Sequence, residues 1–410
     1  MALGLALASA CVPIDAGESE TEGANPGGPA TASATTTSAS AGSSATSGAT
    51  SDSTGSASTG STGASTSGTA SASTSASTTA STSASTSAST TGSTSASTAD
   101  PTGDPTGDAG FDGSPLADPV TTQVFDFLAM EVADVDGDGR ADLILQGTGA
   151  PPRVTVYPGQ ADGRFGDGVE SQVYAFTDLV AGDLDGDGAA EVIVAGTGSP
   201  PRVSIHAATP GSLALPMSGT TVQVWAFDPT RMAIADLDGD ARRDLVLDNK
   251  GGTPPTLFFH AGGDGPGLSA LGEAQVWKYD AIAVGDGDGD GKADVITAVG
   301  SGFPLVWTWP SDGEGGLGEA IESDAFTFTR MDAGDLDGDG IADLITDVPG
   351  NAWRIQLYRG IGDGRFAAPA VHDGFNFEDL EVGDVDGDGK ADVITRPTGW
   401  PPRVDVYRAL

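Results

Sequence analysis

The sequence predicts an all-β fold in which six units of about 50 residues close into a β-propeller. Six acidic loops of the type D-x-D-G-D recur along the chain, with spacings of 49, 53, 50, 49 and 49 residues. They begin at Asp134, Asp183, Asp236, Asp286, Asp335 and Asp384. Gly and Pro interrupt the chain about every ten residues, and no stretch has a helical period. Fifty-residue units of four short strands are typical of propeller blades.

Each unit is expected to contain four strands. In the first unit these are Met130–Ala133 before the acidic loop, Asp142–Gln146 after it, Arg153–Tyr157 after a Gly/Pro turn, and Gln172–Phe176 after a Gly-rich turn. The fourth strand of most units ends at an aromatic residue seven positions before the next loop. These aromatic residues are Phe127, Phe176, Tyr279, Phe328 and Phe377, and in the third unit Phe227 stands nine positions before.

The two ends of the repeat region predict how the ring closes. The last unit stops after its third strand, at Val404–Arg408, while the region begins with an unmatched strand of the fourth type, Thr121–Phe127. We expect this N-terminal strand to complete the last blade, which gives six blades. A seventh, strongly diverged blade and a stacked β-solenoid are the alternatives, although 50 residues is long for one solenoid turn.

The acidic loops carry carboxylates at positions 1, 3, 5 and 9. Calcium needs six to eight hard oxygen ligands at ~2.3–2.6 Å, and side chains at positions 1, 3 and 5 of a tight loop can converge on one ion. The carbonyl of residue 7 and the carboxylate at position 9 can complete the shell, and Gly at position 6 permits a turn with positive φ. Carboxylates this close would repel one another without a cation. Polar Asp/Gly turns without metal are the alternative, and Mg²⁺ is less favoured because the loop offers many protein oxygens.

We therefore predict up to six Ca²⁺ ions, one per unit. The candidate carboxylate ligands are Asp134, Asp136, Asp138 and Asp142; Asp183, Asp185, Asp187 and Glu191; Asp236, Asp238, Asp240 and Asp244; Asp286, Asp288, Asp290 and Asp294; Asp335, Asp337, Asp339 and Asp343; and Asp384, Asp386, Asp388 and Asp392. The candidate carbonyl ligands are those of Arg140, Ala189, Arg242, Lys292, Ile341 and Lys390.

The third loop departs from the pattern because Ala241 replaces the Gly at position 6. A residue with a Cβ at positive φ costs about 1 kcal/mol or more. We predict that this loop binds its ion most weakly.

Charge and cysteine content exclude several classes of function. All 18 Lys and Arg residues lie in the last 300 residues, where 50 of the 58 acidic residues also lie, 24 of them in the loops. A chain this acidic lacks the basic patch of a nucleic-acid-binding or polybasic membrane-surface protein. Its one cysteine, Cys11, excludes an intrachain disulfide and zinc sites built on Cys clusters.

The first eleven residues are apolar and end in Ala8-Ser9-Ala10-Cys11. They resemble the end of a bacterial lipoprotein signal peptide, although Ala8 stands where Leu is usual and no basic segment precedes it. The resemblance implies cleavage before Cys11 and a lipid on its sulfur; a generic secretory signal or an incidental Cys is the alternative. It also implies a bacterial cell envelope location, lipid-anchored and surface-exposed, or secretion.

Residues 12–110 are rich in Ser, Thr, Ala and Gly and are expected to form a disordered linker. The expected organisation is therefore a signal at 1–11, the linker at 12–110, and the propeller at 111–410.

The loops and their β flanks resemble the FG-GAP/VCBS repeat family, whose calcium-loop propellers also form integrin α-chain heads. The resemblance covers about residues 115–410, and the turns at Gly163–Phe165 and Gly364–Phe366 fit it. It implies structural calcium in loops that join the first and second strands of each blade on one face, and often adhesion.

The opposite face would carry the turns between second and third strands, such as Ala150–Arg153, Ser199–Arg202 and Trp400–Arg403. Pro-rich turns with Arg and exposed aromatic residues suit sugars or anionic groups. The alternative is that Pro stiffens these turns and Arg pairs with nearby acids.

No nucleophile or acid–base constellation is visible, and His206, His260 and His372 occur singly, at non-equivalent places. We expect a non-enzymatic adhesion or recognition module with a monomeric head, a carbohydrate or protein ligand, and membrane contact only through a lipid anchor. A calcium-dependent polysaccharide lyase or a structural envelope protein is the alternative.

Overall fold

The computed structural model describes residues 110–111, 113–196, 201–224, 232–249, 254–299, 305–348 and 354–410. The expected signal at 1–11, including Cys11, and the expected linker up to residue 109 lie outside these ranges. Parts of several expected turns and aromatic segments also lie outside them, among them Ser199, Trp225, Phe227, Phe303 and Trp353.

Within the described ranges, 24 strands form six antiparallel sheets of four strands each, and there is no helix, so no helix could span a membrane. The strands of the first three sheets are β2 (Phe127–Ala133), β3 (Asp142–Gly147), β4 (Arg153–Tyr157) and β5 (Val169–Gln172); β6 (Phe176–Gly182), β7 (Glu191–Gly196), β8 (Arg202–His206) and β9 (Thr220–Gln223); and β10 (Met232–Ala235), β11 (Asp244–Asn249), β12 (Thr256–Ala261) and β13 (Ser269–Gln275). Those of the other three are β14 (Ala281–Gly285), β15 (Asp294–Val299), β16 (Leu305–Trp309) and β17 (Ile321–Asp324); β18 (Met331–Gly334), β19 (Asp343–Asp347), β20 (Arg354–Tyr358) and β21 (Ala370–Asp373); and β22 (Phe377–Gly383), β23 (Asp392–Pro397), β24 (Arg403–Tyr407) and β1 (Val120–Gln123).

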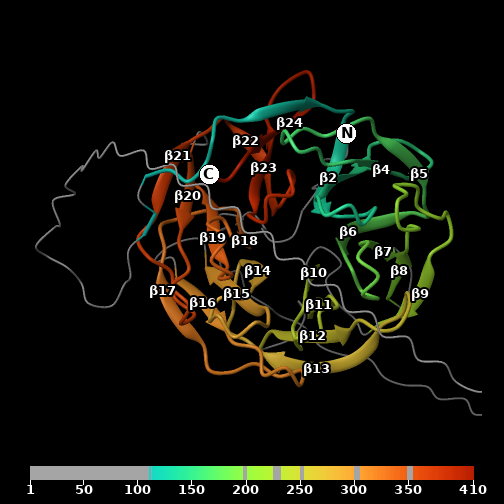
Figure 1. Ribbon diagram of the computed structural model, residues 1–410. Coiled ribbons are helices and arrows are strands. Elements are labelled where there is room, and N and C mark those ends of the chain that lie inside the picture. Colours follow the sequence, from blue (N-terminus) through green and yellow to red (C-terminus); the bar gives the residue numbers. More distant parts are fainter. Residues whose placement is uncertain are drawn as a thin grey trace, which may run out of the picture. The chain divides into compact units, whose positions relative to one another are not determined.

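The six sheets are the blades of a propeller, numbered 1 to 6 in this order. Figure 1 shows them arranged in a ring, with the first strand of each blade next to the axis and the fourth at the rim. The first strand of each blade also contacts the first strands of both neighbours, including β22 with β2. The six-bladed, all-β fold predicted from the repeat is confirmed.

The predicted closure of the ring is also confirmed. β1 pairs antiparallel with β24, so that Val120 lies opposite Val406, and β24 continues the order β23–β22 of blade 6. The hydroxyl of Thr121 donates a hydrogen bond to Oδ1 of Asp405 at 2.6 Å. Both ends of the repeat region therefore contribute strands to one blade.

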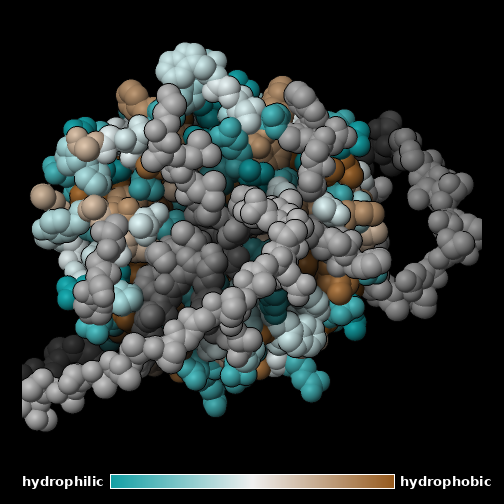
Figure 2. Space-filling view, turned by 180° about the vertical axis from the view of Figure 1, so that it is seen from behind, coloured by the Kyte–Doolittle hydropathy of each residue, from teal (hydrophilic) through white to brown (hydrophobic). Residues whose placement is uncertain are grey.

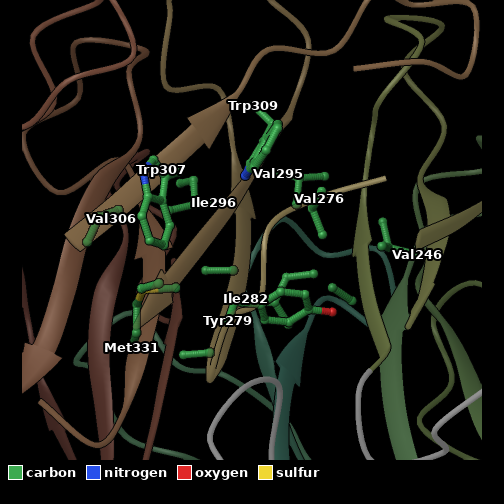
Figure 3. Packing of buried hydrophobic residues seen from close by; sticks show 14 of the residues in the cluster. Val246, Val276, Tyr279, Ile282, Val295, Ile296, Val306, Trp307, Trp309 and Met331 are labelled. Atoms are coloured by element: carbon green, nitrogen blue, oxygen red, sulfur yellow. The ribbon is translucent and has the colours of Figure 1, made fainter. Parts of the chain in front are cut away.

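The second strand of each blade forms its core because it is covered on both faces by the adjacent blades. β3 and β15, for example, are buried along all but their last residue. Figure 3 shows the largest packed cluster, in which Val295 and Ile296 of β15 lie among Trp307, Trp309 and Tyr279. Strands buried on both faces are almost continuously apolar, as in Leu143-Ile144-Leu145.

The predicted position of the fourth strand is wrong. β5 ends at Gln172, where Gln172–Phe176 was expected to be the strand, and Phe176 begins the first strand of the next blade. The N–H of Val173 still donates to the carbonyl of Pro152 at 3.3 Å, after which the chain leaves the rim and crosses to the axis. Tyr174 is exposed on this crossing while Phe176 is buried, so an apolar alternation that resembles a strand belongs to the crossing between blades.

Candidate metal centre

Each acidic loop connects the first strand of its blade to the second. In blade 1 the loop follows β2, which ends at Ala133, and its ninth residue, Asp142, is the first residue of β3. Because successive strands of a blade are antiparallel, all six loops lie on one face of the ring, which we call the loop face. The turns between second and third strands and the crossings between blades lie on the opposite face, which we call the crown face.

The first carboxylate of each loop organises the turn. Oδ1 of Asp134 accepts a hydrogen bond from the N–H of Gly137 at 2.7 Å, and Oδ2 accepts one from Gly139 at 2.8 Å. The same pair of bonds from positions 4 and 6 is made in the other five loops. The first Asp of each loop therefore fixes the shape of the turn through hydrogen bonds from backbone N–H groups.

The ninth carboxylate is buried at the start of the second strand. Oδ2 of Asp142 accepts the N–H of Val135 at 2.9 Å, and Oδ1 accepts the N–H of Gly159 at 2.9 Å. Asp142 is 1% exposed. It joins the loop to the residues that follow the third strand of the same blade.

The loops are also joined to one another. The N–H at position 8 of each loop donates to the position-1 carbonyl of the loop before it, as Ala190 does to Asp134 at 2.6 Å. The first loop closes the circle, because Ala141 donates to the carbonyl of Asp384 at 2.7 Å. Six hydrogen bonds thus form a continuous ring on the loop face.

The predicted carboxylates come together as groups able to hold a metal ion. In four loops, ligand oxygens from positions 1, 3 and 9 lie within 4.8 Å of one another, and in the fifth those from positions 1, 3 and 5 do. The four triads are Asp134, Asp136 and Asp142; Asp183, Asp185 and Glu191; Asp236, Asp238 and Asp244; and Asp286, Asp288 and Asp294.

Two observations show that these groups fit a cation. Oδ1 of Asp136, Asp185 and Asp386, all at position 3, is buried without a hydrogen-bond partner among the described residues. Burial is also the main reason that the pKa of the ninth carboxyl is raised, to about 7 for Asp142 and to about 6 for Asp244, with the carboxylates at positions 3 and 1 adding repulsion. A bound cation would supply a partner for the position-3 oxygens and a counter-charge for the ninth carboxylate. The carbonyl ligands expected at position 7 stay a prediction.

The sixth position needs a positive φ, as predicted. Gly139, Gly188, Gly291, Gly340 and Gly389 have φ between 86° and 90°, and Ala241 has φ 71°. Ala241 donates its N–H to Oδ2 of Asp236 at 2.9 Å, so the third loop keeps the shared shape despite the strain of its Cβ.

Basic side chains at the loops are a feature that the sequence analysis missed. At position 7, Arg140, Arg242 and Lys292 contact the position-5 Asp of their own loops. Their side chains thus partly offset the negative charge of the loop carboxylates. The sequence analysis predicted a role only for their backbone carbonyls.

The fifth loop has an additional cation from outside the loop. Nε of Arg359 lies 2.6 Å from Oδ2 of Asp337, and its NH2 atom lies 2.6 Å from Oδ2 of Asp339. Arg408 takes the equivalent place in blade 6, 3.3 Å from Asp386. Each arginine lies 22 residues after position 3 of its loop. The two positions come into contact because the third strand of the blade returns to the loop face.

A family model described as FG-GAP-like repeat matches residues 134–194 and 259–346, which include loops 1, 2, 4 and 5. The matched parts of the propeller are therefore FG-GAP-like repeats. This confirms the resemblance inferred from the loops. A comparison with curated proteins gave no match.

Among solved structures, the propeller is similar to part of the Tc holotoxin pore of Photorhabdus luminescens, at 22% identity and a TM-score of 0.47. It is also similar to a TcdB2-TccC3 complex without the hypervariable C-terminal region, at 16% identity and a TM-score of 0.41. In both cases the match covers 73% of this chain but only 15% of the length of the other. The rhamnogalacturonan lyase PL11 of Bacillus licheniformis matches over 73% of this chain and 74% of its own, at 14% identity and a TM-score of 0.37.

The first prediction concerns Ala241. Because its φ is positive in the metal-free loop, Ala241→Gly should raise the free energy of unfolding by about 1 kcal/mol and tighten Ca²⁺ binding at loop 3. Gly389→Ala is the matched reverse change in loop 6, where a Cβ meets no atom within 4 Å, and should lower both quantities. Chemical denaturation and per-site Ca²⁺ titration by NMR measure them. An unchanged affinity in Ala241→Gly would refute loop 3 as the weakest site.

The second prediction concerns Arg359. Its guanidinium occupies the charge partners that an ion at loop 5 would use, so Arg359→Gln should increase the Ca²⁺ affinity of that loop several-fold. The exposed Arg365, which pairs with Asp363 away from the loop carboxylates, supplies the control Arg365→Gln. Titration with a competing chromophoric chelator measures the change. A weaker site in Arg359→Gln would mean that Arg359 supports the ion rather than competing with it.

The third prediction concerns pH. Burial raises the pKa of the ninth carboxyl to about 7 in Asp142, Glu191 and Asp343, whereas such a group has a pKa of about 4 in the unfolded chain. The folded state therefore binds more protons than the unfolded state in this window, so raising the pH destabilises the chelated protein. A cation competes with these protons, and the increase in melting temperature on adding Ca²⁺ should be larger at pH 8 than at pH 6. Calorimetry at both pH values would contradict this if the two increases were equal.

Proposed function

We propose that this protein is a calcium-loaded, non-catalytic recognition module that binds a carbohydrate ligand on its crown face. The ions in the six loops would be structural, holding the loop face together so that the crown face keeps its shape. Support for calcium comes from the oxygen-only ligand groups, the unpaired oxygens at position 3, and the match to the FG-GAP-like repeat model.

The observation that carries the binding proposal is a set of exposed aromatic residues on the crossings between blades. Each crossing residue precedes a buried position at the start of the next blade, and each is about half exposed or more. These residues are Phe125 (80%), Tyr174 (58%), Trp277 (53%), Phe326 (60%) and Phe375 (49%). The remaining crossing places Trp225 outside the described residues. Aromatic rings repeated at one level of a ring offer flat apolar contacts for a ligand that spans several blades.

Arginines begin the third strands of several blades at the crown face, and Arg403 lies 5.8 Å from the centroid of the Phe375 ring. Arg153 pairs with Glu170 at 2.5 Å and Arg354 with Asp373 at 2.9 Å, as the alternative interpretation of these turns expected. Both side chains nevertheless remain about half exposed, at 45% and 49%. Alternating rings and paired charges suit a ligand with hydroxyl or carboxylate groups around an apolar face.

The crown face also has a pocket of about 170 Å³ at the junction between blades 6 and 1. Trp400, 85% exposed, and Arg403 lie at its edge, and Asp126 and Glu378 add carboxylates. Arg396 lies over the Phe127 ring, 4.3 Å from its centroid. A cavity of this size fits one sugar ring. Elsewhere on the described surface, hydrophobic side chains reach solvent at separate places around the ring (Figure 2).

The three histidines do not form a shared site. His206, His260 and His372 lie on β8, β12 and β21 of three different blades. Nδ1 of His206 is hydrogen bonded to the carbonyl of Pro216 at 2.8 Å, and Nδ1 of His372 to the hydroxyl of Ser114 at 2.6 Å. Their separation supports the proposal of a binding module over that of a histidine-based enzyme.

The fourth prediction tests this function on a glycan array probed with the calcium-loaded protein. We expect binding to a defined class of sugars, reduced at least tenfold in a Trp400→Ala/Arg403→Ala variant and in the Arg153→Ala/Arg202→Ala/Arg403→Ala variant. Met217→Ala is the matched control, because Met217 is 51% exposed on the connection between β8 and β9, on the opposite face.

A blank array with correctly folded protein would overturn the carbohydrate proposal and favour a protein ligand or a structural role. Release of unsaturated products from an anionic polysaccharide would instead favour the lyase alternative. Unchanged binding in both crown variants, with unchanged melting temperatures, would remove the crown face from consideration.

We also propose a bacterial cell envelope location in which Cys11 carries a lipid and residues 12–110 separate the propeller from the membrane. The support is the sequence Ala8-Ser9-Ala10-Cys11 and the composition of the following residues. Metabolic labelling with a palmitate analogue tests the anchor, and an unlabelled mature chain would exclude it.

A further inference from the structure

The axis of the propeller encloses a cavity of about 510 Å³ that is lined by the first strands of all six blades. Val, Ala, Ile and Gly residues from these strands and from the acidic loops make up most of its lining. Charged loop residues also line it, namely Asp134, Asp183, Asp236, Asp286, Arg243 and Lys292. No aromatic residue and no sulfur-containing residue is among the described residues that line it. Small apolar residues therefore border the cavity, with charged residues among them.

Three carboxylates enter this cavity at one level. Glu131 on β2, Asp332 on β18 and Glu381 on β22 each precede the first Asp of their loops by three residues. The equivalent positions in the other blades hold Val180, Ala233 and Ala283. β18, β22 and β2 are neighbours around the ring, so the three acids share one side of the cavity. They lie outside the D-x-D-G-D motif, and no function of the loops requires them.

Two of these carboxylates have oxygens without partners. Glu131 is 7% exposed and Glu381 is 3% exposed. Within the described part of the chain, Oε2 of Glu131 and Oε1 of Glu381 are buried and receive no hydrogen bond. Asp332 accepts a hydrogen bond on Oδ1 from the N–H of Ala333 at 2.9 Å, and the backbone N–H of Val382 also hydrogen bonds to its carboxyl group. Buried carboxylate oxygens left unpaired are strongly unfavourable unless a proton or a cation accompanies them.

The three acids also repel one another. Burial raises the pKa of Glu131 and Glu381 well above the usual range, and the charges of neighbouring acids, Asp332 among them, raise both further. Burial likewise raises the pKa of Asp332 to about 7. Asp178 and Asp379, two residues earlier on their strands, add negative charge next to this level.

Three of the nearby basic residues, Arg330, Arg396 and Lys292, have partners other than the three acids. Arg330 pairs with Asp347 at 3.0 Å and donates from Nε to the carbonyl of Glu378 at 2.6 Å, and it lowers the pKa of Asp379 rather than that of the three acids. Arg396, which also acts on Asp379, lies over Phe127. Arg243 and Lys292 line the cavity from blades 3 and 4, on the side away from the acids, and Lys292 is bound to Asp290.

We propose that Glu131, Asp332 and Glu381 bind one hard divalent cation, Ca²⁺ or Mg²⁺, in the axial cavity, at a site separate from the six loops. The donor set is oxygen only, which is the chemistry of these two ions. Because the carboxylates come from three strands around a cavity with room for water, the ion keeps part of its water shell. The site bridges blades 5, 6 and 1, and so it spans the junction at which both ends of the propeller meet.

The test compares the full chain with a Glu131→Gln/Glu381→Gln variant, in which both side chains keep their size and shape but lose their negative charge. Bound metal per chain is measured by equilibrium dialysis and mass spectrometry, separately with Ca²⁺ and with Mg²⁺. We expect the variant to bind one ion per chain fewer than the parent with Ca²⁺, with Mg²⁺ or with both. The metal that shows this difference is the one that the axial site binds. Glu170→Gln, a change of the same type on an exposed strand, should keep the parent's count.

Melting temperature gives a second readout. In chelator the variant should melt at a higher temperature than the parent, because the repulsion is removed, while the increase on adding metal should be smaller. An ion count equal to the parent's, with an equal metal-induced increase, would overturn the proposal and show that protons neutralise these acids.

If the double variant does not fold, Asp332→Asn and the parent protein decide the question. Crystals of the parent grown in Mn²⁺ should show an anomalous peak between the three carboxylates, absent in Asp332→Asn. A parent crystal with peaks in the loops and none in the cavity would refute the site.

Discussion

A closed ring of six backbone hydrogen bonds between the acidic loops is the interaction on which the rest of this propeller depends. Each bond runs from the N–H at position 8 of one loop to the position-1 carbonyl of the loop before it, and Ala141 to Asp384 completes the circle. The bonds require that all six loops have the same shape. That shape follows from the first Asp, which accepts two N–H groups of its own loop, and from residues that tolerate positive φ at positions 4 and 6. The repeated motif is thus a requirement of the ring as much as of metal binding.

The same loops carry an electrostatic cost that the backbone alone does not remove. The ninth carboxylate, such as Asp142, is buried where it ties the loop to the end of the third strand, and it lies beside two or three further carboxylates. Bound cations, protons and basic side chains are three ways to offset this charge. The loops differ in the third of these: Arg140, Arg242 and Lys292 act within their own loops, whereas Arg359 spans two carboxylates of loop 5 from the next connection. Six similar loops can therefore differ in their need for an ion.

The antiparallel order of the strands divides the molecule into two chemically different faces. Acidic loops gather on one face, while exposed aromatic residues and half-exposed arginines gather on the other. The axial cavity between them contains three carboxylates outside the loops, from the blades at and next to the junction of the last and first blades. Structural ions and ligand contacts can in this way occupy separate parts of one ring.

The sequence by itself determined the number of blades, the strand order and the grouping of carboxylates in each loop, because these follow from a local motif repeated at a nearly constant period. The unmatched strand before Asp134 and the missing strand after Tyr407 also sufficed to predict the closure. Only the tertiary structure decided which residues from different blades meet. The fourth strand was misplaced because the alternation around Tyr174 comes from a crossing between blades, whose exposure depends on the neighbouring blade. Arg359 at loop 5 and the three acids at the axis were likewise invisible in the sequence, since residues far apart along the chain come into contact only when the ring closes.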